Sequence, residues 1–136
     1  MIYLDTNIFI YPHTGDDNKA QTCSKIIEKS ITGEIEAGSS VLTWDEFHYS
    51  LIKKLDKEKA TALSKDFISI PNLAIFETNL KTISKAQELI EIYNLKPRDA
   101  IHAATAILNG CDIIISDDPD FDRVKELKRI APEKFK

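Results

Sequence analysis

The sequence predicts an α/β fold: a single doubly wound domain in which a mainly parallel sheet of short strands is flanked by helices. Two observations support this prediction. Short segments that are apolar at nearly every position recur along the chain, and segments with helical spacing of apolar residues separate them. Strands without polar alternation are buried on both faces, as in parallel sheets, and parallel neighbours need a crossover that is usually helical.

The predicted strands are short, and turn or capping residues flank them. The clearest is the isoleucine run before Ser116, because β-branched residues favour extended backbone. We expect strands at residues 1–4, 40–43, 73–76 and 112–116, with a fifth edge strand at residues 129–130.

Helix signals fill the intervals between these strands. Apolar residues recur every three or four positions from residue 19 to residue 31, and Gly33 follows as a stop signal. Asp56 and Asn79 stand where N-caps are expected, and Pro97 suits the first turn of a helix. We expect helices at residues 19–31, 43–55, 57–70, 80–93, 97–109 and 124–127, and a loop with one helical turn at residues 5–18.

Composition and length fit one domain spanning residues 1–136, with 43% hydrophobic residues and a formal net charge of −4. The acidic balance disfavours a simple nucleic-acid coat protein, which is usually basic, but it is compatible with a nuclease that has an acidic metal site. Two cysteines far apart in sequence predict reduced thiols in a cytoplasmic protein. No segment is apolar for long enough to predict a membrane span.

Acidic residues are expected at one edge of the sheet. Asp5 follows the first strand, Glu46 lies in the first turn of the helix after the second, and Asp117 and Asp118 follow the fourth. Asp99 lies in the first turn of its own helix. Doubly wound folds bind ligands outside the carboxyl ends of their strands, where helix amino ends also gather. Four acids, one from each of these parts of the chain, are therefore expected to meet there, with Asp117 and Asp118 both open for the last segment.

Each acid taken alone also has a structural explanation. Glu46 completes a capping box with Thr43, and Asp99 complements the dipole of its helix. Asp118 is suited to a turn or an N-cap, and Asp5 to an Asx-turn. Capping explains Asp5 least easily, because this acid directly follows a core strand.

Taken together, the four acids favour a metal site. Carboxylates that share a site repel one another and raise each other's pKa, so a counter-charge is needed. Oxygen ligands without a cluster of His or Cys suit Mg²⁺ or Mn²⁺ rather than zinc. A divalent ion in such a site positions a phosphate and activates water for attack on a phosphodiester.

Four stretches, IYLDTNIFI, TWDEF, RDAIHAATAILNGCDIIIS and SDDPDFDRV, together extend over nearly the whole chain. In this order they resemble the PIN-domain family of metal-dependent ribonucleases, which includes the VapC-type toxins of bacteria and archaea. The first and third stretches are the most specific. They combine an Asp-Thr-Asn sequence after a strand with an alanine-rich helix that begins near Asp-Ala.

The resemblance implies particular site residues. The catalytic and metal-binding acids of the family fall on Asp5, Glu46, Asp99 and Asp118. Ser116 and Phe121 are the anchors that select Asp118, while Asp117 and Asp120 stay open as alternatives for the fourth ligand. The residues expected to support the site are Asn7, Ser116, Asp117 and Asp120.

The resemblance further implies a Mg²⁺- or Mn²⁺-dependent endoribonuclease that cleaves single-stranded RNA, forms homodimers and, as a toxin, binds a small antitoxin protein. Two alternatives stay open. One is a non-catalytic PIN-like module that binds RNA or protein. The other is a housekeeping RNA-processing nuclease without an antitoxin.

Basic and aromatic residues near these stretches are candidates for RNA contact. Arg98 adjoins a predicted metal ligand and is the basic residue we expect at the site. Tyr11, His13 and Trp44 lie next to site segments and are able to stack on bases, although such residues more often serve in packing. His102 lies one helical turn after Asp99, and we interpret it as a helix residue near the site rather than as a ligand.

Overall fold

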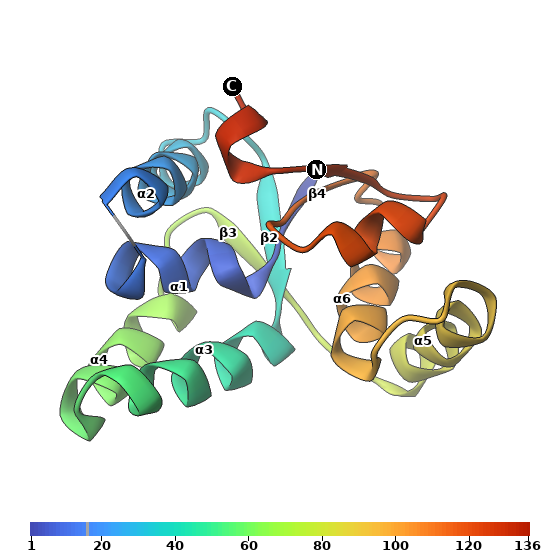
Figure 1. The fold of residues 1–136 in the computed structure, drawn as a ribbon, viewed down its shortest axis with the longest axis horizontal. Coiled ribbons are helices and arrows are strands. Elements are labelled where there is room, and N and C mark those ends of the chain that lie inside the picture. The colour runs from blue at the N-terminus through green and yellow to red at the C-terminus, as the bar shows by residue number, and fades with distance from the viewer. Residues whose placement is uncertain (16) are drawn as a thin grey trace.

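The computed structural model describes residues 1–15 and 17–136 and contains a five-stranded sheet in which all paired strands are parallel. The strand order is β3–β2–β1–β4–β5, so the chain moves outward from β1 in both directions. This arrangement confirms the predicted doubly wound α/β fold class (Figure 1). The strands are β1 (Ile2–Leu4), β2 (Ala37–Ser40), β3 (Leu73–Phe76), β4 (Ile113–Ile115) and β5 (Lys128–Ile130).

Six α-helices and the 3₁₀ helix η1 connect the strands in the described residues, and a second 3₁₀ helix, η2, follows the last strand. Asp56 and Asn79 cap their helices by accepting backbone N–H groups, as predicted, and Pro97 is the first residue of its helix. None of the helices within 1–15 and 17–136 is long and apolar enough to cross a membrane. The helices are α1 (Thr6–Thr14), α2 (Asp17–Ile31), α3 (Val41–Lys54), α4 (Lys57–Ile68), α5 (Leu80–Tyr93), α6 (Pro97–Leu108), η1 (Pro119–Arg123) and η2 (Pro132–Lys134).

Each face of the sheet has its own apolar core. Helices α1 to α4 lie on one side of the sheet and α5, α6 and η1 on the other (Figure 1). Tyr3 and Ile114 belong to the core under α5 and α6, whereas Leu4 and Ile115 belong to the core under α1 to α4. Neighbouring residues of a strand point to opposite faces. Strands β1 and β4 are therefore apolar at consecutive positions because both of their faces are buried.

The second strand lies earlier than the sequence suggests. Strand β2 covers Ala37–Ser40 rather than residues 40–43. Ser40 ends the strand, and its Oγ accepts the backbone N–H of Leu42, so helix α3 begins at Val41. Small residues of this strand carry little strand propensity, and tertiary packing in the middle of the sheet decides their conformation.

Two further segments also differ from the expectation. Most of the region expected as a loop with one helical turn forms α1 and the start of α2, while residue 16 lies outside the described residues. Helix α1 packs against α2 and α3, so adjacent residues such as Ile8 and Phe9 are both buried and the helical spacing of apolar residues is lost. Residues 124–127 form no helix, and the helical turn lies earlier, in η1.

Phe121 anchors the acidic loop to the core and gives a test of this fold. Its side chain is fully buried in the core under α5 and α6. We expect Phe121→Ala to lower the free energy of unfolding by about 3–5 kcal/mol, because truncation leaves a cavity. Leu80→Ala, at a position 79% exposed, is the control and should change it by no more than about 0.5 kcal/mol. Urea denaturation measures the free energy of unfolding of both variants, and equal losses of stability would contradict the buried packing of Phe121.

Candidate active site

A pocket of about 310 Å³ opens at the carboxyl edge of the sheet, where β1 and β4 end and α1, α3 and α6 begin. All four acids that the sequence singles out, Asp5, Glu46, Asp99 and Asp118, line this pocket. They come from four separate parts of the chain, and the parallel sheet brings them together at one edge.

Asp5 is the most buried of the four acids, with 6% of its surface exposed. Its Oδ1 accepts the backbone N–H of Thr6 at 2.8 Å, so it caps α1. Its Oδ2 accepts the Ser116 hydroxyl at 2.6 Å and the Asn7 amide at 3.3 Å. Burial raises the pKa of Asp5, while the charge of His102 and the hydrogen bonds from Ser116 and the backbone of Thr6 act in the opposite direction. Asn7 and Ser116 thus lie where they orient this carboxylate.

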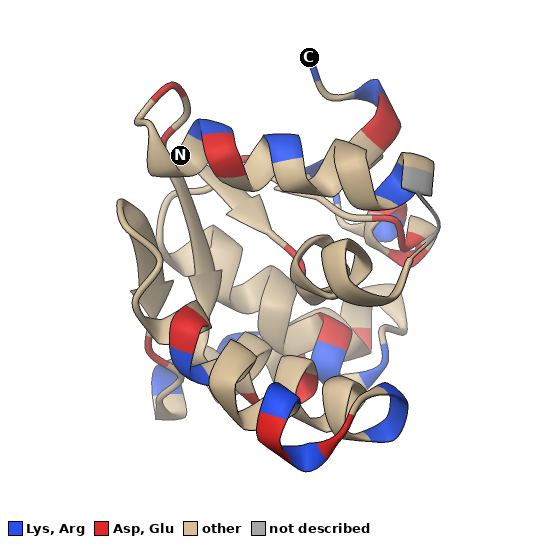
Figure 2. Cartoon of the chain, turned by 90° about the vertical axis from the view of Figure 1, so that its left-hand side faces the viewer, with Lys and Arg blue, Asp and Glu red and all other residues tan. Residues whose placement is uncertain are grey.

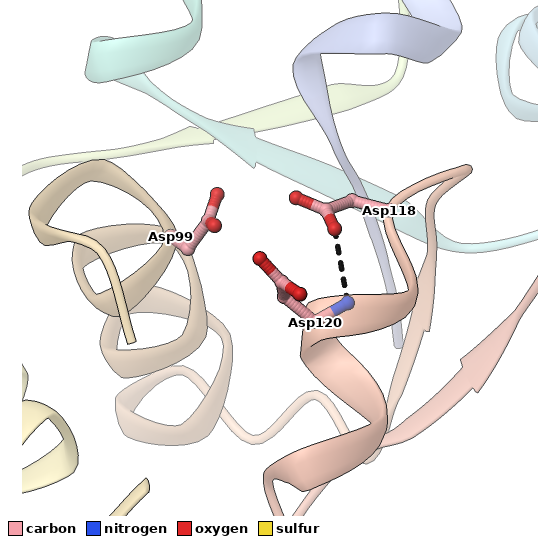
Figure 3. A group of neighbouring side chains, drawn as sticks. All are labelled: Asp99, Asp118 and Asp120. Carbon is pink, nitrogen blue, oxygen red and sulfur yellow. Dashed lines mark hydrogen bonds between the residues drawn. The ribbon is translucent and has the colours of Figure 1, made fainter. Parts of the chain in front are cut away.

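Asp99, Asp118 and Asp120 form a second, more open group of carboxylates. One oxygen from each lies within 4.8 Å of the other two, and Figure 3 shows the three side chains pointing toward a common centre. Asp118 caps η1 by accepting the backbone N–H of Asp120 at 2.9 Å. Burial, together with the charges of Asp118 and Asp5, raises the pKa of Asp99 to about 6.

Glu46 forms no capping box, and a buried histidine holds it instead. The N-cap of α3 is Ser40, while Thr43 lies inside the helix and its hydroxyl is 2.7 Å from that of Ser39. His102 hydrogen-bonds Glu46 Oε1 through Nε2. Burial raises the pKa of Glu46, but the hydrogen bonds from His102 and Thr6 and the charges of His102 and Arg98 together outweigh burial, and the pKa is lowered. The structural explanation of Glu46 as a cap is therefore wrong.

Asp117 points away from the pocket that its neighbour Asp118 lines. Its Oδ2 accepts the Tyr11 hydroxyl at 2.7 Å and forms an ion pair with Lys19 at 2.8 Å. The hydrogen bond from Lys19 is the main cause of a lowered pKa at Asp117. Of the three alternatives for the fourth acid, Asp118 and Asp120 face Asp99. Asp117 instead links the loop after β4 to α1 and α2.

The rim of the pocket carries one basic residue from the sequence prediction and one aromatic residue that the sequence analysis missed. Arg98 lines the pocket beside Asp99. Tyr49, which is 56% exposed, also lines it. Tyr49 lies three positions after Glu46 on α3, so helical spacing was the signal that could have found it.

The aromatic candidates from the sequence lie elsewhere. Tyr11 binds Asp117, and the ring of His13 lies 6.0 Å from that of Phe47. Trp44 lines a separate apolar pocket with residues of α4 and β3. None of these three side chains lines the acidic pocket.

The donor set fits a hard divalent cation. The side chains that converge offer carboxylate oxygens, the ligands that Mg²⁺ and Mn²⁺ prefer. The raised pKa of Asp99 reflects burial and repulsion that a cation would counteract. Asp99, Asp118 and Asp120 are close enough to share an ion, and Asp5 and Glu46 line the same pocket.

The fold and the site together define a parallel α/β protein with an acidic pocket at the carboxyl edge of its central strands. Residues 2–127 match the family model of the PIN domain, and the chain belongs to this family. The earlier resemblance is thereby confirmed.

Curated relatives of similar length match nearly the whole chain. Ribonuclease VapC2 of Methanocaldococcus jannaschii is 30% identical over 137 residues, which cover 95% of this chain and 92% of that protein. Ribonuclease VapC7 of Mycobacterium tuberculosis is 24% identical over 136 residues, which cover 98% and 92%.

Solved structures share the fold at low sequence identity. VapBC2 from Rickettsia felis, bound to a DNA fragment from its promoter, contains a chain with a TM-score of 0.72 and 23% identity, covering 96% of this chain and 98% of that one. VapC20 of Mycobacterium tuberculosis, described as a toxin that cleaves the sarcin–ricin loop, has a TM-score of 0.75 and 15% identity, covering 92% and 95%.

The raised pKa of Asp99 predicts a pH-dependent effect on stability. Because the pKa is about 6 in the folded state and the ordinary value is 3.8, the folded protein keeps this proton to higher pH, and stability falls as pH rises through that window. In chelator at about pH 7.5, Asp99→Asn should be more stable than the native chain by about 1–2 kcal/mol, after allowance for solvent screening.

The difference in stability between Asp99→Asn and the native chain should vanish below the unfolded-state pKa of Asp99, where both side chains are neutral. Asp112→Asn, at an exposed position away from the pocket, is the control. Thermal unfolding across the pH range measures all three proteins. A gap between Asp99→Asn and the native chain that does not change with pH would contradict the prediction.

Proposed function

We propose that the chain is a Mg²⁺- or Mn²⁺-dependent endoribonuclease that cleaves single-stranded RNA and serves as the toxin of a VapBC-type toxin–antitoxin pair. The observation that carries the proposal is the acidic pocket at the carboxyl edge of a PIN fold, lined by Asp5, Glu46, Asp99 and Asp118. Two relatives that the chain matches over nearly its full length are named ribonucleases of the VapC group, which supports the same activity.

The side chains of the pocket are proposed to have different roles. Asp5, Asp99 and Asp118 are proposed to bind the ion directly or through water, and Asp120 lies close enough to assist. The bound ion would polarise the scissile phosphate and lower the pKa of water for in-line attack. Glu46 is proposed to bind the ion or to orient the attacking water.

RNA binding is proposed to depend on local contacts at the rim rather than on a broad basic surface. Figure 2 shows basic and acidic residues interspersed along the helices, in keeping with the net charge of −4. Arg98 is the proposed phosphate contact, since the described part of the chain gives its guanidinium no hydrogen-bond or ion-pair partner and it lines the pocket. The exposed ring of Tyr49 offers a surface on which a base can stack.

A small antitoxin protein and a second copy of the chain are the proposed protein partners, and the cytoplasm is the proposed location. Several solved structures with this fold are VapBC complexes, which supports an antitoxin partner. The complete set of pocket acids argues against a module that binds RNA without cutting it.

Two adjacent aspartates offer a matched test of the nuclease site. The purified chain should cleave a mixed single-stranded RNA pool with Mn²⁺ or Mg²⁺ and not with chelator. Asp118→Asn should slow cleavage by more than about 100-fold, because losing a ligand costs more than losing a residue that supports one. Asp117→Asn, whose side chain is bound by Lys19 and Tyr11 outside the pocket, should keep the native rate. Gel analysis of the products measures the cleavage rates of both variants, and equal rates would contradict the assignment of Asp118 to the nuclease site.

The toxin role makes a separate prediction in cells. Expression of the native chain in a bacterial host should arrest growth, because RNA cleavage stops protein synthesis, and Asp5→Asn should relieve the arrest. Growth curves with matched expression levels make the measurement. A chain that cleaves RNA in vitro but leaves growth unchanged would favour a housekeeping RNA-processing nuclease.

A further inference from the structure

His102 is the one ionisable residue among the buried residues of α6 that the structure describes. Its side chain is 2% exposed, and the other buried residues of α6 are four alanines and Thr105. Small alanine side chains let α6 approach the sheet closely, so His102 reaches toward β1 and α3 from the same helix that carries Asp99. The imidazole thus lies directly beneath the acidic pocket, which it also lines.

Both ring nitrogens of His102 have partners from other elements. Nδ1 lies 2.6 Å from the hydroxyl of Tyr3 on β1, and Nε2 is hydrogen-bonded to Oε1 of Glu46 on α3. A carboxylate only accepts hydrogen bonds, so Nε2 must carry the proton of this bond. The ring is therefore fixed on its far side by Tyr3 and donates to Glu46 on its near side.

These contacts determine which oxygen of Glu46 is free. The described residues make two hydrogen bonds to this carboxylate, from His102 and from the Thr6 hydroxyl at 3.0 Å, and both end on Oε1. Oε2 is left without such a partner in the described residues, on a side chain that lines the pocket. Nε2 of His102 also lies 3.8 Å from Oδ1 of Asp5, so the ring stands between two of the pocket acids.

We propose that His102 is a positioning residue that holds Glu46 Oε1 so that Oε2 faces the bound ion and the attacking water. This inference rests on the proposed nuclease function and adds a residue to it. A glutamate has three rotatable side-chain bonds, and the hydrogen bond from a ring fixed by Tyr3 restricts them before metal or RNA arrives. His102 touches neither ion nor substrate in this role.

Two substitutions separate positioning from packing. In His102→Gln the amide nitrogen reaches the place of Nε2 and keeps a donor for Glu46. In His102→Asn the shorter amide reaches the place of Nδ1 and keeps only a partner for Tyr3. His48→Leu is the control, since His48 lies on the same helix as Glu46 but bonds the Ser64 hydroxyl at 2.8 Å outside the pocket.

The measurements are Mn²⁺ affinity by calorimetry without RNA, and single-turnover cleavage rate and KM for RNA at saturating Mn²⁺. His102→Asn should lower the Mn²⁺ affinity or the cleavage rate by about 10–100-fold with little change in KM. His102→Gln should recover much of that loss, and His48→Leu should match the native chain. Native behaviour of His102→Asn, or equal losses in the Asn and Gln variants, would overturn the proposal.

The native protein provides a readout that does not depend on how the variants fold. In ¹⁵N NMR, titration with Mg²⁺ should shift the Nε2 resonance of His102 and leave that of His48 in place. An unmoved His102 resonance in a protein that binds Mg²⁺ would overturn the proposal.

Asp5→Asn distinguishes failure of this inference from failure of the proposed function. Full cleavage by Asp5→Asn would overturn the nuclease site itself. Loss of cleavage in Asp5→Asn together with native Mn²⁺ affinity and rate in His102→Asn would overturn only the role of His102.

Discussion

Repulsion between carboxylates at the carboxyl edge of the sheet is the constraint to which the surrounding structure responds. Burial raises the pKa of Asp99, and the charges of Asp118 and Asp5 raise it further. A fold that brings these groups together gives up stability at neutral pH unless cations or hydrogen-bond donors offset the repulsion. The strand order forces this meeting, because β1 and β4 are neighbours and their carboxyl ends share one edge.

Hydrogen-bond donors next to Asp5 and Glu46 offset part of the repulsion between the carboxylates. Ser116, Asn7 and the backbone of Thr6 donate to Asp5. The hydroxyl of Thr6 and the ring of His102 donate to Glu46. These two acids are thus held from within the protein, whereas Asp99 faces mainly other acids. These donors contribute to the lowered pKa of Glu46, whereas burial is the largest cause of the raised pKa of Asp5 and of Asp99.

Three of the aspartates after β4 make different interactions, because the path of the backbone points them in different directions. Asp117 turns outward to Lys19 and Tyr11, and Asp118 turns inward and caps η1. Asp122 forms an ion pair with Arg129 on β5 at 2.9 Å. The buried ring of Phe121 fixes η1 between these acids, so one short segment both closes the fold and completes the pocket.

Apolar periodicity and the edge rule for parallel sheets are local or topological, so the sequence alone predicted the fold class, most strand and helix positions, and Asp5, Glu46 and Asp99 as pocket acids. For the fourth acid these rules left neighbouring aspartates open, and the family resemblance selected Asp118. The sequence did not reveal α1, because that helix packs against two others and lost its spacing signal. That Asp117 lies outside the pocket and that His102 lines it became evident from the three-dimensional arrangement. Those outcomes depend on the direction of each side chain relative to elements far away in sequence, which neither composition nor spacing encodes.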